Sequence, residues 1–165
     1  GHFKDWKRDD WIRAIDQNML TSIEMIKAVI DSMVMNKFGR IVNITSGSVK
    51  SPIRELGLSN GARAGLTGFV AGIAREYAQY NVTINNLLPG QFNTARIENL
   101  IETRAKEEGI APQKLRANLQ RENPSGRLGE IVEFGFACAW ICSVHSGYLV
   151  GQNILLDGGV FNSTQ

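Results

Sequence analysis

The sequence contains no apolar run long enough to cross a membrane and no block of like charges. A transmembrane helix needs about 20 consecutive apolar residues, and the first residues, Gly1 to Trp6, do not form a signal peptide. Lysine and arginine are dispersed, so the net charge of +2 does not form the basic patch of a nucleic-acid-binding protein. We therefore expect a cytoplasmic protein that binds neither membrane nor nucleic acid.

Cysteine is also scarce, and two residues do not make a disulfide framework. Cys138, Cys142 and His145 would share one face of a helix, a pattern that can also bind a metal ion. No second cluster of cysteine and histidine accompanies them, and buried free cysteines are common core residues. We therefore expect no metal site.

Composition and hydrophobic periodicity fit one globular domain or part of one, since 43% of residues are hydrophobic and 21% charged. Apolar residues at helical or strand spacing define the regular elements. The expected elements are, in chain order, an amphipathic helix starting at Asp9–Asp10, a strand from Gly39 ending at Ser46, a helix at 59–80, and then a strand at 82–88, a helix at 130–142 and a strand at 153–156. Their alternation predicts an α/β fold with a parallel, doubly wound sheet.

Residues 91–129 interrupt this alternation because they are polar, charged and broken by Gly109, Pro112 and Pro124. We expect short helices in a mobile insertion on the substrate side of the domain. Its basic side chains are interleaved with glutamates, which favours a solvated helix surface over a docking site for an acidic partner.

The helix at 59–80 contains a stripe of four glycines, Gly61, Gly65, Gly68 and Gly72, on one face. Each glycine costs about 1 kcal/mol relative to alanine inside a helix, so a close neighbour must compensate. That neighbour is either the protein's own sheet or a helix of a partner subunit, and the pattern does not decide between them. We expect a homodimer or homotetramer.

The chemically informative segment runs from Gly39 to Arg63. Ser46 follows a buried strand, and polar groups at the carboxyl end of a parallel strand face the ligand crevice of an open α/β sheet. Ser59 follows Ser46 by 59 − 46 = 13 positions, and Arg63 comes four residues later. Asn18 lies within the first long helix.

This arrangement resembles the short-chain dehydrogenase/reductase family. That family has a serine at this strand end, a Tyr-x-x-x-Lys motif beginning thirteen positions later, and an asparagine in the preceding helix. Asn18 and Ser46 match the family residues, while Ser59 replaces the tyrosine and Arg63 the lysine. Further matches along the chain are Pro89-Gly90 with Thr94, Arg127-Leu128-Gly129-Glu130, and Gly151-Gln152 with Asp157-Gly158-Gly159.

The resemblance implies a single partial Rossmann-like domain over residues 1–165, which corresponds to the C-terminal two-thirds of a typical member. It also implies a cofactor, NAD or NADP. The residues expected to bind it are Arg63, Pro89, Gly90, Phe92 and Thr94. The chain has no G-x-G-x-x-G turn, so a dinucleotide site formed by these residues alone would lack its adenosine half.

The replacement of tyrosine by Ser59 bears on mechanism. A phenol with a pKa of about 10 can be lowered toward neutrality and used as a general acid, whereas an aliphatic hydroxyl ionises far less readily. Serine is also a favoured helix N-cap, and we expect Ser59 to begin its helix in that role. Arg63 keeps a positive charge but does not release a proton near neutral pH.

Two functions therefore remain open. The resemblance to 3-oxoacyl-(acyl-carrier-protein) reductases implies an enzyme that interconverts a carbonyl and an alcohol, with an acyl carrier protein as one conceivable partner. In that enzyme Ser46 would polarise the substrate oxygen, Asn18 would hold a water, and Ser59 would act through a bridging water. The alternative is a catalytically silent family member that serves as a binding or assembly subunit.

Overall fold

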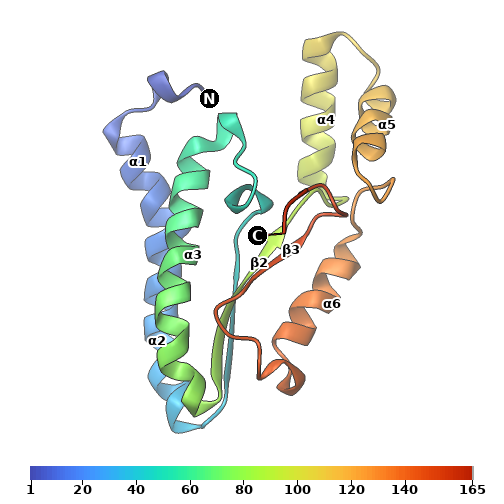
Figure 1. Cartoon of the computed structure of the whole chain (residues 1–165). Helices are drawn as coiled ribbons and strands as arrows, with labels where there is room; N and C mark the ends of the chain where they lie inside the picture. The colour runs from blue at the N-terminus through green and yellow to red at the C-terminus, as the bar shows by residue number, and fades with distance from the viewer. Residues whose placement is uncertain (165) are drawn as a thin grey trace.

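Three parallel strands form the centre of the molecule in this computed structural model, which describes residues 1–164 (Figure 1). They are β1 (Gly39–Ile44), β2 (Val82–Pro89) and β3 (Asn153–Leu156), in the order β1-β2-β3. Helices cover both faces of the sheet. The α/β, doubly wound fold class expected from the sequence is therefore confirmed.

Two long helical segments pack on one face of the sheet, and a third helix packs on the other (Figure 1). The first face carries α1 (Arg8–Ile15), which continues through a π-helical turn (Asp16–Leu20) into α2 (Thr21–Met35), and α3 (Gly57–Tyr77). The opposite face carries α6 (Ile131–Ile141). Short 3-10 helices at Phe3–Asp5, Gly47–Val49, Arg54–Leu56, Ala78–Tyr80 and Val144–Ser146 complete the description.

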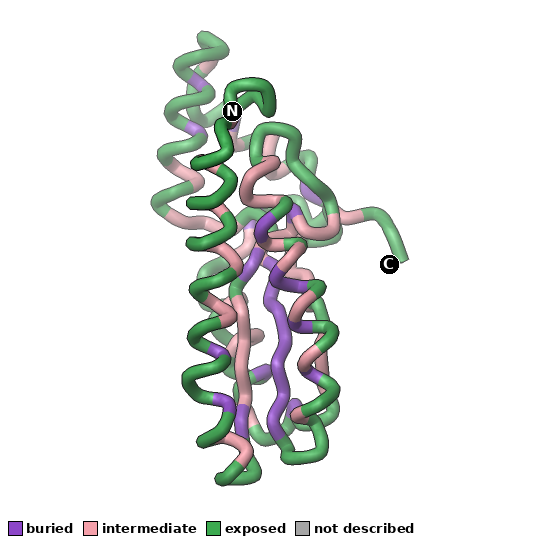
Figure 2. The backbone as a smooth tube through the Cα atoms, turned by 90° about the vertical axis from the view of Figure 1, so that its left-hand side faces the viewer, coloured by how far each residue is buried: buried purple, intermediate pink, exposed green. Residues whose placement is uncertain are grey.

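Burial is concentrated along β2, the central strand (Figure 2). All residues from Val82 to Leu88 are buried, as expected for a parallel strand covered on both faces. Apolar side chains of α2 and α3 close the main core over this strand; the buried members are Ile26, Ile30, Leu66, Val70, Ala74, Val82 and Ile84. The sheet is thereby fixed against one helical layer, and its carboxyl edge is left to form the site.

The segment at 91–129 forms two helices beyond the carboxyl ends of the strands (Figure 1). They are α4 (Ala95–Glu108) and α5 (Pro112–Glu122), and they share a small core of Ile101, Ala105 and Leu115. Gly109, in the left-handed conformation, ends α4, and Pro112 occupies the first turn of α5. The same residues that interrupt the sequence pattern thus mark the helix boundaries.

A row of asparagine amides crosses all three strands. Asn43 Nδ2 donates to Asn86 Oδ1 (3.2 Å), and Asn86 Nδ2 donates to Asn153 Oδ1 (2.8 Å). The three residues are register partners, and Asn86 is completely buried. A shift of one residue in either strand pair would separate these amides, so the row favours the observed register.

Helix α3 begins earlier than the sequence pattern predicts, and the expected N-cap role of Ser59 is wrong. The helix starts at Gly57 after Leu56, so Ser59 lies inside its first turn. The Trp6 ring occupies the space where a side chain at position 57 would lie. The start of α3 is therefore packed against Trp6 of the N-terminal segment and has no side-chain hydroxyl as its cap.

The glycine stripe divides into two halves. A Cβ atom at Gly61 would lie 3.2 Å from the Trp11 ring, and one at Gly65 would lie 3.0 Å from Met19 Sδ. At Gly68 and Gly72 a Cβ atom would meet no described atom within 4 Å. The first half therefore permits packing of α3 against the α1–α2 segment, while the second half leaves an open surface on the described chain.

The proposed Cys/His face is also only partly formed. His145 lies in the 3-10 turn Val144–Ser146, outside α6. Burial raises the pKa of the Cys142 thiol, and neighbouring Cys138 raises it further through its charge and a hydrogen bond.

Among residues 1–164, no helix is both long and apolar enough to span a membrane.

We predict that removing both amides of the Asn43–Asn86 pair costs less than the two single losses combined. Asn86→Val leaves the Asn43 amide without its acceptor, and we expect it to lower the free energy of unfolding by about 1 to 3 kcal/mol. Adding Asn43→Val removes the orphaned group, so the double variant should recover part of this loss. Urea unfolding of the full-length protein measures the cycle. If the double variant loses as much unfolding free energy as the two single variants together, the Asn43 and Asn86 amides are not directly coupled.

We also predict different consequences for leucine at two positions of the glycine stripe. Gly65→Leu should overpack against Met19 and destabilise the fold by about 1 to 3 kcal/mol. Gly68→Leu should leave the fold intact by circular dichroism and, if this surface contacts a second subunit, shift the protein to a smaller species in light scattering with size exclusion. A wild-type protein that is monomeric at high concentration would refute the expected homo-oligomer.

Candidate active site

Ser46 lies at the carboxyl end of the first strand, two residues after Ile44. Its backbone is extended, and its hydroxyl oxygen caps the 3-10 helix Gly47–Val49 by accepting a hydrogen bond from the Ser48 N–H (3.1 Å). A hydroxyl that accepts in this way keeps its own hydrogen for donation. Ser46 is thus held in place while still able to donate to a ligand.

The pocket beside Ser46 has a volume of about 270 Å³ and lies at the carboxyl edge of the sheet. This is where open α/β sheets bind ligands. Hydroxyl groups, backbone from the β2 end and apolar side chains form its wall. The lining residues are Ser46, Gly47, Ser48, Ser51, Ile53, Pro89, Gly90, Gln91, Leu119, Glu122, Asn123, Asp157, Val160 and Phe161.

Arg63 joins α3 to the end of β1. Its Nε donates to Ser59 Oγ (3.0 Å), and its Nη1 donates to the main-chain oxygens of Ile44 (3.2 Å) and Thr45 (2.9 Å). Burial lowers the pKa of the Arg63 guanidinium, and the charge of Arg96 lowers it further. Arginine nevertheless stays protonated in proteins, so this side chain brings a fixed positive charge beside Ser46.

The turn after β2 requires glycine because the chain approaches β3 closely. Gly90 N–H donates to the Leu156 carbonyl (2.8 Å), and a Cβ atom at Gly90 would lie 2.7 Å from the Asp157 Cα. Thr94 then begins α4, where its side chain accepts a hydrogen bond from the Ile97 N–H. The Pro89-Gly90 pair and Thr94 therefore shape the chain that leaves the pocket.

The Asp157 carboxylate closes the other end of the pocket wall. Its Oδ1 accepts from Gly159 N–H (2.9 Å) and its Oδ2 from Phe161 N–H (2.8 Å). Asn123 Nδ2 donates to the Asp157 carbonyl (3.0 Å), which ties the end of α5 to the end of β3. Asp157 thus has a structural role that occupies both of its carboxylate oxygens.

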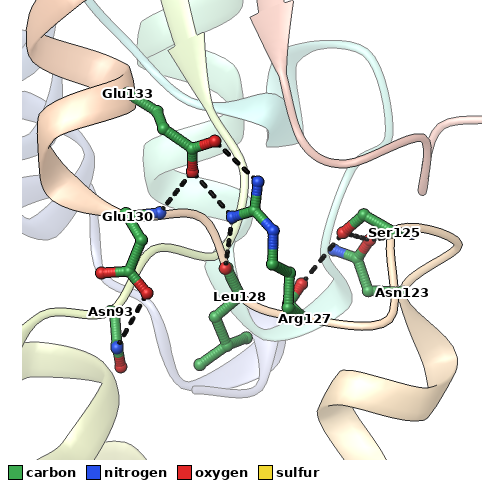
Figure 3. Close-up of polar contacts among 7 residues, drawn as sticks. All are labelled: Asn93, Asn123, Ser125, Arg127, Leu128, Glu130 and Glu133. Atoms are coloured by element: carbon green, nitrogen blue, oxygen red, sulfur yellow. Dashed lines mark hydrogen bonds and ion pairs between the residues drawn. The ribbon is translucent and has the colours of Figure 1, made fainter.

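The Arg127-Leu128-Gly129-Glu130 motif stabilises the beginning of α6 (Figure 3). The Arg127 guanidinium forms two hydrogen bonds to Glu133, which also accepts from the Glu130 N–H (2.7 Å). The Arg127 hydrogen bond, followed by the Glu130 backbone bond, lowers the pKa of Glu133 to about 2. The ion pair and the helix cap therefore persist throughout the neutral pH range.

The residues expected from the sequence do not all reach one cavity. Ser46, Pro89 and Gly90 line the Ser46 pocket. Phe92 lines a smaller neighbouring pocket, and its ring packs edge-on against Phe134 of α6, with the ring centroids 5.3 Å apart. Four of the expected residues line neither of these two pockets, namely Asn18, Ser59, Arg63 and Thr94.

Asn18 lies in the π-helical turn between α1 and α2. Its Nδ2 donates to the Ala14 carbonyl (3.0 Å), and the Thr21 hydroxyl donates to the Asp16 carbonyl (2.9 Å). These side-chain bonds satisfy carbonyls where the regular helical pattern is broken. The half-buried Asn18 side chain therefore has a visible local role at this break.

Sequence reasoning missed several residues of the pocket wall, above all Ser48, Glu122 and Phe161. Ser48 is two residues from Ser46, so its position could have been noticed from the chain alone. Glu122 and Phe161 are distant in sequence and reach the pocket only because α5 and the C-terminal segment fold over the sheet edge. No local pattern identifies them.

Comparison with known proteins places this arrangement in context. The family model described as enoyl-(acyl carrier protein) reductase matches residues 1–161. The chain is 31% identical to 3-oxoacyl-(acyl-carrier-protein) reductase FabG of Haemophilus influenzae, an alignment that covers 95% of this chain and 60% of the relative. It is 34% identical to acetoacetyl-CoA reductase of Cupriavidus necator, where the alignment covers 96% of this chain and 60% of the relative.

A solved reductase structure also has the same fold as this chain. The solved structure of YwfH, an NADPH-dependent reductase involved in bacilysin biosynthesis, superposes with a TM-score of 0.91 at 28% identity, covering 98% of this chain and 62% of that one. The chain therefore spans about three-fifths of the length of the relatives it matches. With the strand end, the Ser46 position and the family model in agreement, the chain belongs to the short-chain dehydrogenase/reductase family of oxidoreductases.

Proposed function

We propose that this chain forms the catalytic part of an NAD(P)-dependent reductase that interconverts a carbonyl and an alcohol, with substrates like those of 3-oxoacyl reductases. The observation that supports it best is Ser46, whose oxygen accepts the Ser48 N–H while its hydrogen remains available to the pocket. The named relatives, a 3-oxoacyl reductase and an acetoacetyl-CoA reductase, favour the same substrate class. An acyl carrier protein is the corresponding macromolecular partner to test.

The residues at the sheet edge fit one end of a nicotinamide cofactor. Relatives described as NADPH-dependent support a nicotinamide cofactor. Pocket volumes for ligands are typically about 300 Å³ or more, so a pocket of about 270 Å³ suits a nicotinamide ring or a small substrate rather than a whole dinucleotide. Arg63, Pro89, Gly90, Phe92 and Thr94 are the residues we assign to this end. The bound cofactor supplies the hydride.

In the proposed reaction, the Ser46 hydroxyl donates a hydrogen bond to the substrate oxygen and stabilises the negative charge that develops there. The positive charge of Arg63 acts from the neighbouring helix, and its bonds to Ile44 and Thr45 hold the strand end in position. Arg63 already donates three hydrogen bonds, to Ser59, Ile44 and Thr45. We therefore assign it two roles, which are to hold the strand end and to bind a ribose hydroxyl.

Ser59 is our candidate for proton delivery, through a bridging water. Its oxygen accepts from Arg63 Nε, which leaves its own hydrogen free to donate. A serine hydroxyl is a much weaker acid than a phenol, so this step should be slower than in a family member with tyrosine. Asn18 is assigned to hold a water, in addition to its bond with Ala14.

The Ser59–Arg63 hydrogen bond also favours a second candidate, a silent binding or assembly subunit. Ser59 and Arg63 bond to each other, and Arg63 also bonds to the strand end at Thr45, so both side chains are engaged within the fold. Cofactor binding with turnover supports the reductase, whereas cofactor binding or assembly without turnover supports the silent subunit.

We predict that Ser46→Ala in the full-length protein lowers kcat/KM for a carbonyl substrate by about 10²-fold or more, the effect of losing one oriented donor to an oxyanion. Oxidation of NADH or NADPH, followed by absorbance, measures it. Ser32→Ala on the exposed surface of α2 is the matched control and should keep wild-type activity. Unchanged turnover in Ser46→Ala would remove the hydroxyl from the mechanism.

We predict that Ser59→Tyr combined with Arg63→Lys raises kcat, because a phenol next to an ammonium group is the stronger general acid. The same absorbance assay measures the gain, and Arg63→Lys alone serves as the control because it lacks the phenol. A pair variant that binds the cofactor and is no faster than the wild-type protein would show that proton delivery by residue 59 does not limit the reaction.

A further inference from the structure

Ser48 is a buried hydroxyl without a hydrogen-bond partner in the wall of the Ser46 pocket. The residue is 3% exposed, and its Oγ bonds to no group among residues 1–164. The Oγ atom is itself buried, so the hydroxyl reaches the pocket by rotation about the Cα–Cβ bond. Its backbone N–H is already used, because it donates to Ser46 Oγ. The side chain is therefore a polar group left over after the local hydrogen bonds are complete.

An unbonded buried hydroxyl is unfavourable, so most such groups in native proteins find a partner, and that partner can be a ligand or water. Thr45, Asn60 and Thr83 also have unbonded buried atoms in the described part of the chain, but none of them lines the Ser46 pocket. Ser48 alone among these four combines an unsatisfied group with a cavity wall. This combination points to something that binds in the pocket.

The turn between the two serines is tightly fixed. A Cβ atom at Gly47 would lie 3.3 Å from the Pro89 carbonyl oxygen and 3.4 Å from Leu155 Cδ1. The absence of a side chain at Gly47 thus lets the turn pack closely against the ends of β2 and β3. Ser46 and Ser48 are presented as a pair whose Cα atoms are at most about 7 Å apart.

We propose that Ser48 Oγ is a specificity-determining hydroxyl, which bonds to a second, neutral oxygen of the substrate while Ser46 binds the reacting carbonyl. The inference rests on the proposed reductase function. Two hydroxyls from one short turn suit carbonyl compounds with a hydroxyl, ketone or ester oxygen a few bonds from the reacting carbon. Among residues 1–164, the charged side chains that line the pocket are Glu122 and Asp157, both acidic. An uncharged oxygen is therefore favoured over a carboxylate or a phosphate at this position.

The test compares two ketones that differ only in the second oxygen, 4-hydroxybutan-2-one and butan-2-one. Steady-state kinetics use the full-length protein with NADPH. The wild type should prefer the hydroxyketone. Ser48→Ala should lose about 3- to 10-fold in kcat/KM for it, mainly through KM, as expected for one neutral hydrogen bond. Its kcat/KM for butan-2-one should not change.

Thermal unfolding separates this role from a structural one. Removing an unsatisfied hydroxyl should leave the Tm of Ser48→Ala equal to that of the wild type or above it. Thr83→Val removes another unbonded buried hydroxyl, away from the pocket, and should leave the preference between the ketones unchanged. If Ser48→Ala does not fold, Ser48→Cys replaces the hydroxyl by a weak donor at nearly the same volume.

A Ser48 variant that keeps the wild-type preference overturns the inference while leaving the reductase function intact. If the wild type turns over neither ketone nor the 3-oxoacyl thioester acetoacetyl-CoA, the proposed function fails. Saturation-transfer NMR with 4-hydroxybutan-2-one then tests the hydroxyl alone. Saturation that weakens in Ser48→Ala supports the inference, and equal or absent saturation in the wild type and the variant overturns it.

Discussion

The site depends on the Arg63 guanidinium and its bonds to the end of β1. Backbone carbonyls need hydrogen-bond partners, and Arg63 supplies donors to two of them at this strand end, those of Ile44 and Thr45. Because Arg63 belongs to α3, this contact fixes the helix and the strand end relative to each other. Ser46 is the next residue, so its position follows from this contact.

Ser59 and Arg63 stand where the resemblance leads one to expect a tyrosine and a lysine, and the structure gives both residues a role in the fold. Arginine presents several donors in a planar fork, while lysine is a compact point charge on a flexible stem. The fork permits simultaneous bonds to Ser59 and to the strand carbonyls, which the structure contains. Arg63 therefore keeps a positive charge at this position and forms three hydrogen bonds within the fold.

The sequence predicted the elements whose pattern is local. Val82 to Leu88 was identified as a buried strand, and the short apolar run that begins at Gly39 and is ended by Ser46 identified the first strand. Features created by contacts between distant residues were not predictable in this way. The start of α3 at Gly57 involves Trp6, and the bonds of Arg63 to Ile44 and Thr45 require the completed fold. The unsatisfied Ser48 hydroxyl is equally invisible until burial is known.

A crystal structure of the full-length protein with a nicotinamide cofactor and an unreactive substrate analogue tests the central claim most directly. The account predicts that Ser46 Oγ lies about 2.6 to 3.2 Å from the analogue oxygen. It also predicts that Arg63 still donates to the carbonyls of Ile44 and Thr45. An analogue oxygen bound away from Ser46, or an Arg63 that leaves the strand end while Ser46 keeps its position, would contradict the account.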